Sequence, residues 1–508
     1  ARDFAGPAVC LSYLLAGGAS LLSALCYAEF ATQIPVSGSA YSYVYVALGE
    51  GWAWMVGWNL VLEYGVAASA IARGWASYLV RFCQHCGTPL PRWSHSLEIP
   101  LWPLSSTGII LFASPVAAAA ILVCTIVLLM GVSESARLNL AITALNLAII
   151  AFIIAAGMTR LQPSNWEPWA PEGLSGIVAG SAYVFFSYIG FDSVCTLAEE
   201  MRNPRRDLPL GVVGSLVVVT VLYAAASLVV TGLTPAAALD LHAPMSEAFA
   251  SAGMPWAASA VAMGSISSLS GTMLCSLFGQ PRIFFQMAKD GLLPPPFMSV
   301  GRRSQVPVFG TVFTGVAAAL LAFFLDGDTL MDLISIGTLM AFVVVCLALV
   351  AHRLEPSPTA WAGVILRGTS SHVWVWTFCA SAALSCISVA QSWSTALVSG
   401  PAAAVAVAAI AALAAFPQRL PGDTAAALPK SEGGQGAATS QPAVGVFVCP
   451  GVPVLPCLGA WVNLYLMASL PPASCVRLLA WSAAGAVVYL AYGVWHSKAA
   501  GSAAAKAM

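Results

Sequence analysis

The residues that could do chemistry interrupt an apolar stretch at 176–214. Ser187, Tyr188, Gly190 and Asp192 fall in its middle. Gly190 weakens a helix, and the side chains of Ser187 and Asp192 compete for its backbone hydrogen bonds. Hydrocarbon tolerates backbone without intrahelical hydrogen bonds only where that backbone faces protein or a watery cavity. The pattern therefore predicts a broken membrane helix whose main-chain carbonyls receive the ammonium group of a solute, and it favours transport.

A continuous helix is the alternative, in which Gly190 only lets a neighbouring helix pack closely. The broken helix is favoured because a cluster of polar residues facing lipid would be costly.

Asp192 and Glu63 are the two acids that lie deepest within predicted membrane spans. An ionised carboxylate costs about 2.5 to 3.5 kcal/mol there, so each should face a cavity or a partner. Asp192 could cap backbone amides at the break. Glu63 could meet a cationic side chain or pair with Asn59, one helical turn earlier, and both interpretations stay open.

Composition places the chain in a membrane. Of its 508 residues 59% are hydrophobic and only 8% are charged, with a mean hydropathy of +0.84, whereas soluble domains carry roughly 25% charged residues. With a net charge of -1 the chain lacks the excess of basic residues that is typical of nucleic-acid-binding proteins. The cysteines lie mostly in apolar windows, and the ligand set of Cys83, His85, Cys86 and His95 is poor, so we expect no metal and no other cofactor.

Apolar windows long enough to cross about 30 Å of hydrocarbon recur along the chain. They predict thirteen membrane-spanning helices, at 8–30, 46–79, 109–130, 138–158, 174–198, 210–232, 257–287, 308–325, 330–351, 373–390, 397–416, 444–470 and 475–495. The span 257–287 also carries a stripe of hydroxyl groups that should face the bundle interior, where they bind either a solute or adjacent helices: Ser265, Ser267, Ser268, Ser270, Thr272 and Ser276.

Loop charges set the orientation. When the chain is threaded through these spans, fourteen Lys and Arg residues fall in the loops of one side and five in those of the other, which puts the first side in the cytoplasm. The C-terminus is then inside and Ala1 outside. Because no signal peptide precedes the first span and the chain does not begin with Met, we expect a further helix upstream. Residues 417–443 are predicted to be a flexible cytoplasmic linker and 497–508 a cytoplasmic tail.

The sequence offers no convincing set of catalytic residues. An intramembrane aspartyl hydrolase needs two membrane aspartates positioned together, and the six His residues are too scattered to supply a base or a ligand set. We therefore expect no enzyme activity.

A series of motifs runs in order along the chain: AGPAV, LCYAEF, IPVSGSAYSYVYVALGE, GWNLVLEY, GVSESARLN, FFSYIGFDSVCTLAEEMRNPRRDLPLG, QPRIFFQMAKDGLLP and DLISIGTLMAF. With them the chain resembles the cationic amino acid transporter family of the amino acid-polyamine-organocation superfamily, over nearly its whole length. The resemblance implies an all-α polytopic membrane protein with a LeuT-like bundle of two inverted five-helix repeats plus extra C-terminal helices. Thirteen of fourteen expected helices are present. Residues 1–351 would be the transporter core with family helices 2–10, 352–416 helices 11–12, and 444–496 helices 13–14.

The resemblance also implies the substrate-binding residues, which match the broken sixth helix and the LEY motif: Phe186, Ser187, Ile189, Phe191, Asp192 and Glu63. In relatives, main-chain carbonyls equivalent to the first three hold the substrate amino group, and the fourth aligns with an aromatic gate. Asn146 stands where some proton-coupled relatives carry a Lys, which resembles the facilitative branch.

The implied function is facilitative uptake of the cationic amino acids arginine, lysine and ornithine by alternating access, driven by the membrane potential. Two alternatives stay open: a non-transporting amino acid sensor or orphan homologue, and a proton-coupled neutral amino acid symporter. The expected partners are the amino acid substrate and the lipid bilayer, without nucleic acid. A plasma membrane is favoured over a vacuolar or lysosomal one, and the oligomeric state stays open.

Overall fold

The computed structural model describes residues 1–2, 4–36, 38–95, 97–100, 110–131, 136–195, 201, 203–240, 243–301, 306–354, 371–390, 395–414, 416 and 447–498. The predicted linker at 417–443 lies outside these residues, as does the predicted tail beyond Lys498. Every structural statement below concerns the described part of the chain.

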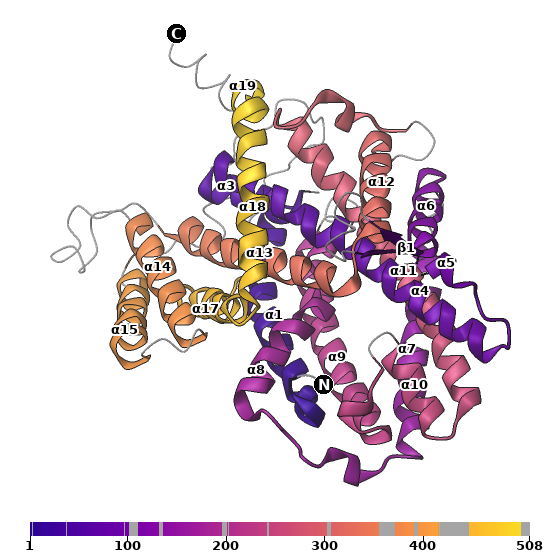
Figure 1. The fold of residues 1–508 in the computed structure, drawn as a ribbon. Helices are drawn as coiled ribbons and strands as arrows, with labels where there is room; N and C mark the ends of the chain where they lie inside the picture. Colours follow the sequence, from indigo (N-terminus) through magenta and orange to yellow (C-terminus); the bar gives the residue numbers. More distant parts are fainter. Residues whose placement is uncertain are drawn as a thin grey trace.

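Helices make up nearly the whole fold (Figure 1). Seven helical stretches are long and apolar enough to cross a membrane. They are built from η1 (Gly6–Ala8) with α1 (Val9–Gln33); α3 (Glu50–Val61), η2 (Leu62–Val66) and α4 (Ala67–His85); α8 (Gly173–Val184) with η6 (Phe185–Tyr188); α9 (Pro204–Leu233); α11 (Pro255–Lys289); α13 (Gly327–Arg353); and α18 (Pro472–Val488) with η11 (Tyr489–Gly493) and α19 (Val494–His496).

Six further helices carry shorter apolar stretches of 10–17 residues. They are α6 (Pro115–Leu129), α7 (Ala136–Met158), α12 (Val308–Phe324), α14 (Ser371–Ala390), α15 (Thr395–Ala414) and α17 (Val454–Ala468). Each predicted span coincides with one of these long or short helices, which confirms an all-helical polytopic membrane protein. The number of crossings stays a prediction, because a 15-residue helix covers only about 22 Å of a hydrocarbon layer about 30 Å thick.

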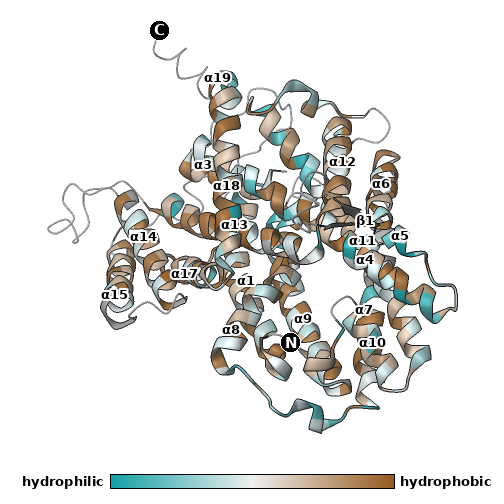
Figure 2. Ribbon diagram, viewed as in Figure 1, coloured by the Kyte–Doolittle hydropathy of each residue, from teal (hydrophilic) through white to brown (hydrophobic). Residues whose placement is uncertain are grey.

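Short elements fill the connections. They are α2 (Ser39–Leu48), α5 (Arg92–His95), η5 (Pro163–Trp166), η8 (Ala236–Ala238), α10 (Pro244–Ser251), η9 (Pro295–Met298) and the antiparallel strands β1 (Leu97–Pro100) and β2 (Ile110–Ala113), in which Leu97 pairs with Ala113. The hairpin is a small addition to the predicted all-helical architecture. Figure 2 shows that polar residues gather at α5 and in the connection between α7 and α8, while apolar residues dominate the long helices.

Burial separates central from peripheral helices. In α13, 89% of the most apolar window is buried inside the protein, and in the α3–α4 stretch 83%, whereas α9 and α18 bury only 22% and 17%. Apolar residues that protein does not cover must face lipid, so α9 and α18 belong to the lipid-facing surface. The segments α14, α15 and α17 pack together at one side of the molecule (Figure 1).

Two pairs of long helices pack closely along each other. α1 packs along α9, and α4 packs along α11. In the order implied by the family resemblance these are helices 2 with 7 and 3 with 8, so each pair joins elements five positions apart. That is the relation expected between equivalent helices of two five-helix repeats.

A buried ion pair fixes α1 to α13. Arg353 donates from Nε and Nη2 to the two carboxylate oxygens of Glu29, at 2.6 and 2.7 Å. Gln33 Nε2 and the backbone N–H of Cys449 also donate to Glu29, at 2.9 and 2.7 Å. Glu29 is fully buried and Arg353 is 4% exposed. Since a buried charge is stable only with its partners in place, this contact joins α1, α13 and the segment before α17.

The first prediction concerns this pair. Arg353→Met leaves the Glu29 carboxylate buried without its counter-charge, so we expect the protein to lose about 3–5 kcal/mol of stability. Thermal unfolding of the purified protein in detergent measures the loss. The double variant Glu29→Gln/Arg353→Met should recover most of it, and Arg160→Met, at an exposed outer-loop position, should change little. Equal destabilisation in the single and double variants would contradict the role given to the pair.

Candidate functional site

The predicted interruption is present between α8 and residue 195. α8 ends at Val184, and one turn of 3-10 helix, η6, follows it. Ile189 is then extended, with φ -63° and ψ 140°, and residues 192–195 form another 3-10 turn. Of the carbonyls predicted to bind substrate, that of Phe186 accepts the backbone N–H of Ile189 at 3.2 Å. The chain therefore crosses this region without a continuous α-helix.

Gly190 is needed for its backbone conformation. Its φ is +114°, a conformation that residues with a side chain rarely adopt. A Cβ built on Gly190 would meet nothing within 4 Å. The alternative interpretation, that this glycine only lets a neighbouring helix approach, is therefore wrong: the space beside it is open, and the turn itself requires glycine.

Asp192 ties the break to two other elements. Its side chain is fully buried, and its Oδ2 accepts a short hydrogen bond from the hydroxyl of Tyr64 in η2. The main-chain carbonyl of Asp192 accepts from Ser39 Oγ at 3.1 Å, at the start of α2. A polar residue this deep needs such partners, because an unsatisfied group in a water-free interior costs several kcal/mol. These two contacts hold the irregular segment against α2 and the α3–α4 stretch.

Glu63 lies in the π-helical turn η2, a distortion that is frequent at functional sites. Its side chain is fully buried, and neither carboxylate oxygen has a hydrogen-bond partner among the described residues. Its carboxyl group is close enough to that of Asp192 for the two to interact. Two interpretations of Glu63 were open, a cationic partner or a hydrogen bond with Asn59, and the structure shows neither among the described residues.

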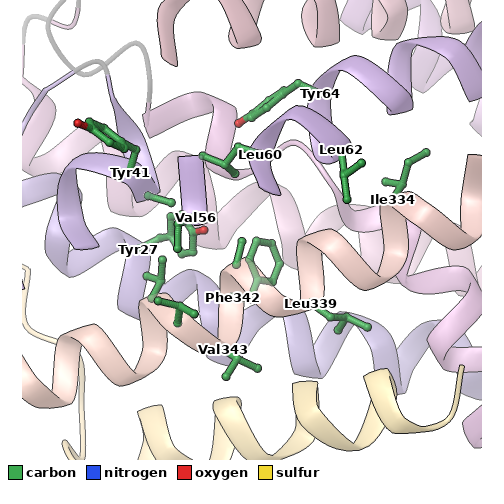
Figure 3. Close-up of a cluster of buried hydrophobic side chains, with 14 of the residues drawn as sticks. Tyr27, Tyr41, Val56, Leu60, Leu62, Tyr64, Ile334, Leu339, Phe342 and Val343 are labelled. Atoms are coloured by element: carbon green, nitrogen blue, oxygen red, sulfur yellow. The ribbon is translucent and has the colours of Figure 1, made fainter. Parts of the chain in front are cut away.

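Buried aromatic rings pack together in the core of the protein, and Figure 3 shows Tyr27 and Phe342 among them. Phe342 of α13 lies 5.5 Å from Tyr27, 5.0 Å from Phe191 and 5.8 Å from Phe185, measured between ring centroids. Tyr27 also meets Phe191 edge-on at 5.5 Å. The hydroxyl of Tyr27 is buried and has no hydrogen-bond partner among the described residues. The structure thus places Phe191, the residue predicted to be a gate, in a buried aromatic cluster.

A cavity of about 540 Å³ opens beside the break. Ser187 of η6 and Asn146 of α7 line it. The hydroxyl stripe of α11 contributes Ser265 and Ser268, which confirms that the stripe faces the interior at these positions. Of the six residues predicted to bind substrate, only Ser187 lies on the cavity wall, while Phe186 and Ile189 pack partly buried beside it.

Sequence reasoning missed three tyrosines of the cavity wall: Tyr13 of α1, Tyr78 of α4 and Tyr223 of α9. Tyr188 donates to the main-chain carbonyl of Tyr13 at 2.7 Å, which connects the break to α1. A tyrosine within an apolar span was the available signal, because its hydroxyl needs a polar partner once buried. The arrangement as a whole is a largely apolar cavity with a few polar side chains on its wall, and it lies against a broken helix.

The chain is similar to known proteins over nearly its whole length. The family model for amino acid permeases matches residues 3–402, and the model for the C-terminus of these permeases matches residues 447–497. A vacuolar cationic amino acid transporter 4 of Arabidopsis thaliana is 39% identical, over 98% of this chain and 88% of its own length. Cationic amino acid transporter 4 of Mus musculus is 34% identical, over 98% and 83%. The branched-chain amino acid permease BcaP of Bacillus subtilis is 32% identical, over 97% and 87%.

The second prediction tests the backbone at the break. Gly190→Ala forces a side chain into a φ of +114°, so we expect a loss of about 1–3 kcal/mol in stability, read as a lower unfolding temperature. Gly214→Ala is the matched control: a Cβ there also meets open space, but Gly214 lies within α9 at an ordinary helical position. The control should be neutral or stabilising by up to about 1 kcal/mol. If both variants unfold alike, the strain assigned to Gly190 is absent.

Proposed function

The chain belongs to the amino acid permease family, and from that premise we propose that it transports amino acids, specifically that it takes up arginine, lysine and ornithine by facilitated diffusion. The observation that carries the cationic preference is Glu63, whose buried carboxyl group has no hydrogen-bond partner among the described residues and lies beside Asp192. A buried carboxylate without a counter-charge is costly. An incoming guanidinium or ammonium group supplies that charge.

The substrate backbone binds at the break. Ser187 lies on the cavity wall, and the irregular backbone from Phe186 to Ile189 offers carbonyl groups to the substrate ammonium. Oriented carbonyls at a broken membrane helix are well suited to bind an ammonium group, because they carry partial negative charge. Unlike a carboxylate, they bring no ionised protein group that must first lose its water. The cationic end of the substrate then points toward Glu63 and Asp192. Phe191 and Phe342, whose ring centroids lie 5.0 Å apart, would have to shift to admit it.

Alternating access moves one helix group against the other. The α1–α9 pair carries contacts to the break. The α4–α11 pair carries the hydroxyl stripe, and η2, which leads into α4, carries Tyr64. Rocking of the first pair against the second around the cavity exposes it to each side in turn. In this proposal residues 1–351 form the transport core, with additional helices at 352–416 and 444–496, and no enzyme activity is assigned.

The driving force is the membrane potential. Asn146 lies on the cavity wall, and its Oδ1 has no hydrogen-bond partner; it carries no titratable proton, which supports uniport. Moving one positive charge through 100 mV is worth about 2.3 kcal/mol, or close to fiftyfold accumulation. We propose the plasma membrane as the site of action, with a vacuolar membrane as the alternative because one relative is named vacuolar.

A neutral amino acid is the second candidate substrate, because one relative is named a branched-chain amino acid permease. In that case the adjacent carboxyl groups of Glu63 and Asp192 hold a proton in place of the substrate cation, and transport is proton-coupled.

Uptake by the purified protein in liposomes tests these functions. Labelled arginine, lysine and alanine are supplied with an inside-negative potential, with and without a pH gradient. Potential-driven arginine uptake without a pH gradient supports the proposal. Alanine uptake that rises with external acidity supports the proton-coupled symporter instead, and absence of uptake for all three substrates supports a sensor.

The third prediction concerns substrate charge. Glu63→Gln removes a charged hydrogen-bond acceptor worth about 1.5–3 kcal/mol, so we expect the KM for arginine to rise by about tenfold to a hundredfold, and the KM for alanine to change far less. Kinetics of uptake in liposomes measure both. Glu172→Gln is the control, because Glu172 is an exposed acid before α8. Equal effects on arginine and alanine would remove Glu63 from the cation pocket.

A further inference from the structure

An ion-pair cluster joins α4 to the connection between α9 and α11. Arg81 Nη2 lies 2.8 Å from Asp240 Oδ2, and Arg81 Nη1 lies 3.5 Å from Glu247 Oε1 in α10. The other oxygen of Asp240 accepts the backbone N–H of Ala243 at 2.8 Å, which fixes the carboxylate to the start of α10. The side chains of Arg81, Asp240 and Glu247, called here the outer latch, are 32%, 24% and 31% exposed.

The outer latch lies where two cavities meet. Asp240 lines both the 540 Å³ cavity beside the break and a second cavity of about 360 Å³. Glu247 lines the second cavity only, together with Thr234 and Ser251. By the distribution of loop charges this end of α4 is on the outer side of the membrane. A solute that enters from outside therefore passes the latch before it reaches Ser187.

A second contact occupies the equivalent place at the opposite end of the bundle. Tyr41 of α2 donates to Asp290 Oδ2 at 2.8 Å, directly after the end of α11. Gln286 Nε2 is 3.4 Å from the same oxygen. α2 connects α1 to α3–α4, just as α10 connects α9 to α11. In each case the C-terminal end of one central helix holds the connecting helix of the other repeat, as a pseudo-two-fold axis requires.

We propose that Arg81, Asp240 and Glu247 form the extracellular gate latch of the carrier, which must open whenever the cavity faces outward, and that Tyr41 with Asp290 is its inner counterpart. The inference rests on the proposed transport function. Partly exposed ion pairs are weak and exchange readily with water, so this latch can break and re-form in each cycle. The fully buried pair of Glu29 and Arg353 does not break easily, because its opening would leave a buried charge without a partner.

The fourth prediction is an accessibility measurement that needs no transport. A cysteine placed at Ser268 on the cavity wall, in a background with Cys83→Ser and Cys86→Ser, is labelled by a membrane-impermeant thiol reagent added from outside. Arg81→Gln removes the latch and should speed labelling by about threefold to tenfold. Asp240→Asn, which breaks the same pair from the other partner, should give a similar increase.

Two controls make the result specific. Arg160→Gln removes a positive charge from an exposed position on the same face and should leave the labelling rate unchanged. The charge-swapped double variant Arg81→Asp/Asp240→Arg should restore slow labelling, which a merely structural role would not produce. Equal rates for Arg81→Gln and Arg160→Gln, or no restoration in the swap, would overturn the latch. Failure of the uptake assay with an intact labelling response would instead overturn the proposed function alone.

Discussion

Hydrocarbon supplies no hydrogen-bond partners, and this constraint governs the centre of the molecule. A helix that stops at Val184 must have the backbone that follows it covered by protein or water. Tyr64 donates to Asp192 Oδ2, Ser39 donates to the carbonyl of Asp192, and Tyr188 donates to the main chain of α1. These contacts stabilise the irregular segment, beside which the cavity lies.

Charges are placed in three different environments, and each suits a different task. Glu29 and Arg353 are buried and fully bonded, so they hold α1 and α13 together permanently. Arg81 and Asp240 are partly exposed, so their contact is weak and reversible. Glu63 is buried without a hydrogen-bond partner. A buried charge in that condition is stable only with a proton or a nearby cation.

Much of the architecture could be predicted from the residues alone. Apolar stretches of fixed length locate the helices, because the thickness of the bilayer leaves few other solutions. The break was also predictable, since Ser187, Gly190 and Asp192 are residue types that disfavour a continuous helix through their local backbone preferences. The open space beside Gly190 could not be predicted from the sequence. The missing hydrogen bond between Glu63 and Asn59 could not be predicted either, because both features depend on how neighbouring helices pack.

The sequence by itself therefore determined a membrane bundle with one interrupted helix, because helix length and backbone breaks follow from local composition and the bilayer. Only the tertiary structure decided that Tyr64 meets Asp192, 128 residues away, and that Arg81 meets Asp240, 159 residues away. It also decided that tyrosines from α1, α4 and α9 share a cavity with Ser187. Such long-range contacts depend on how each helix is rotated about its axis and how deep it lies relative to its neighbours. Many packings bury the same apolar faces, so hydropathy alone cannot choose among them.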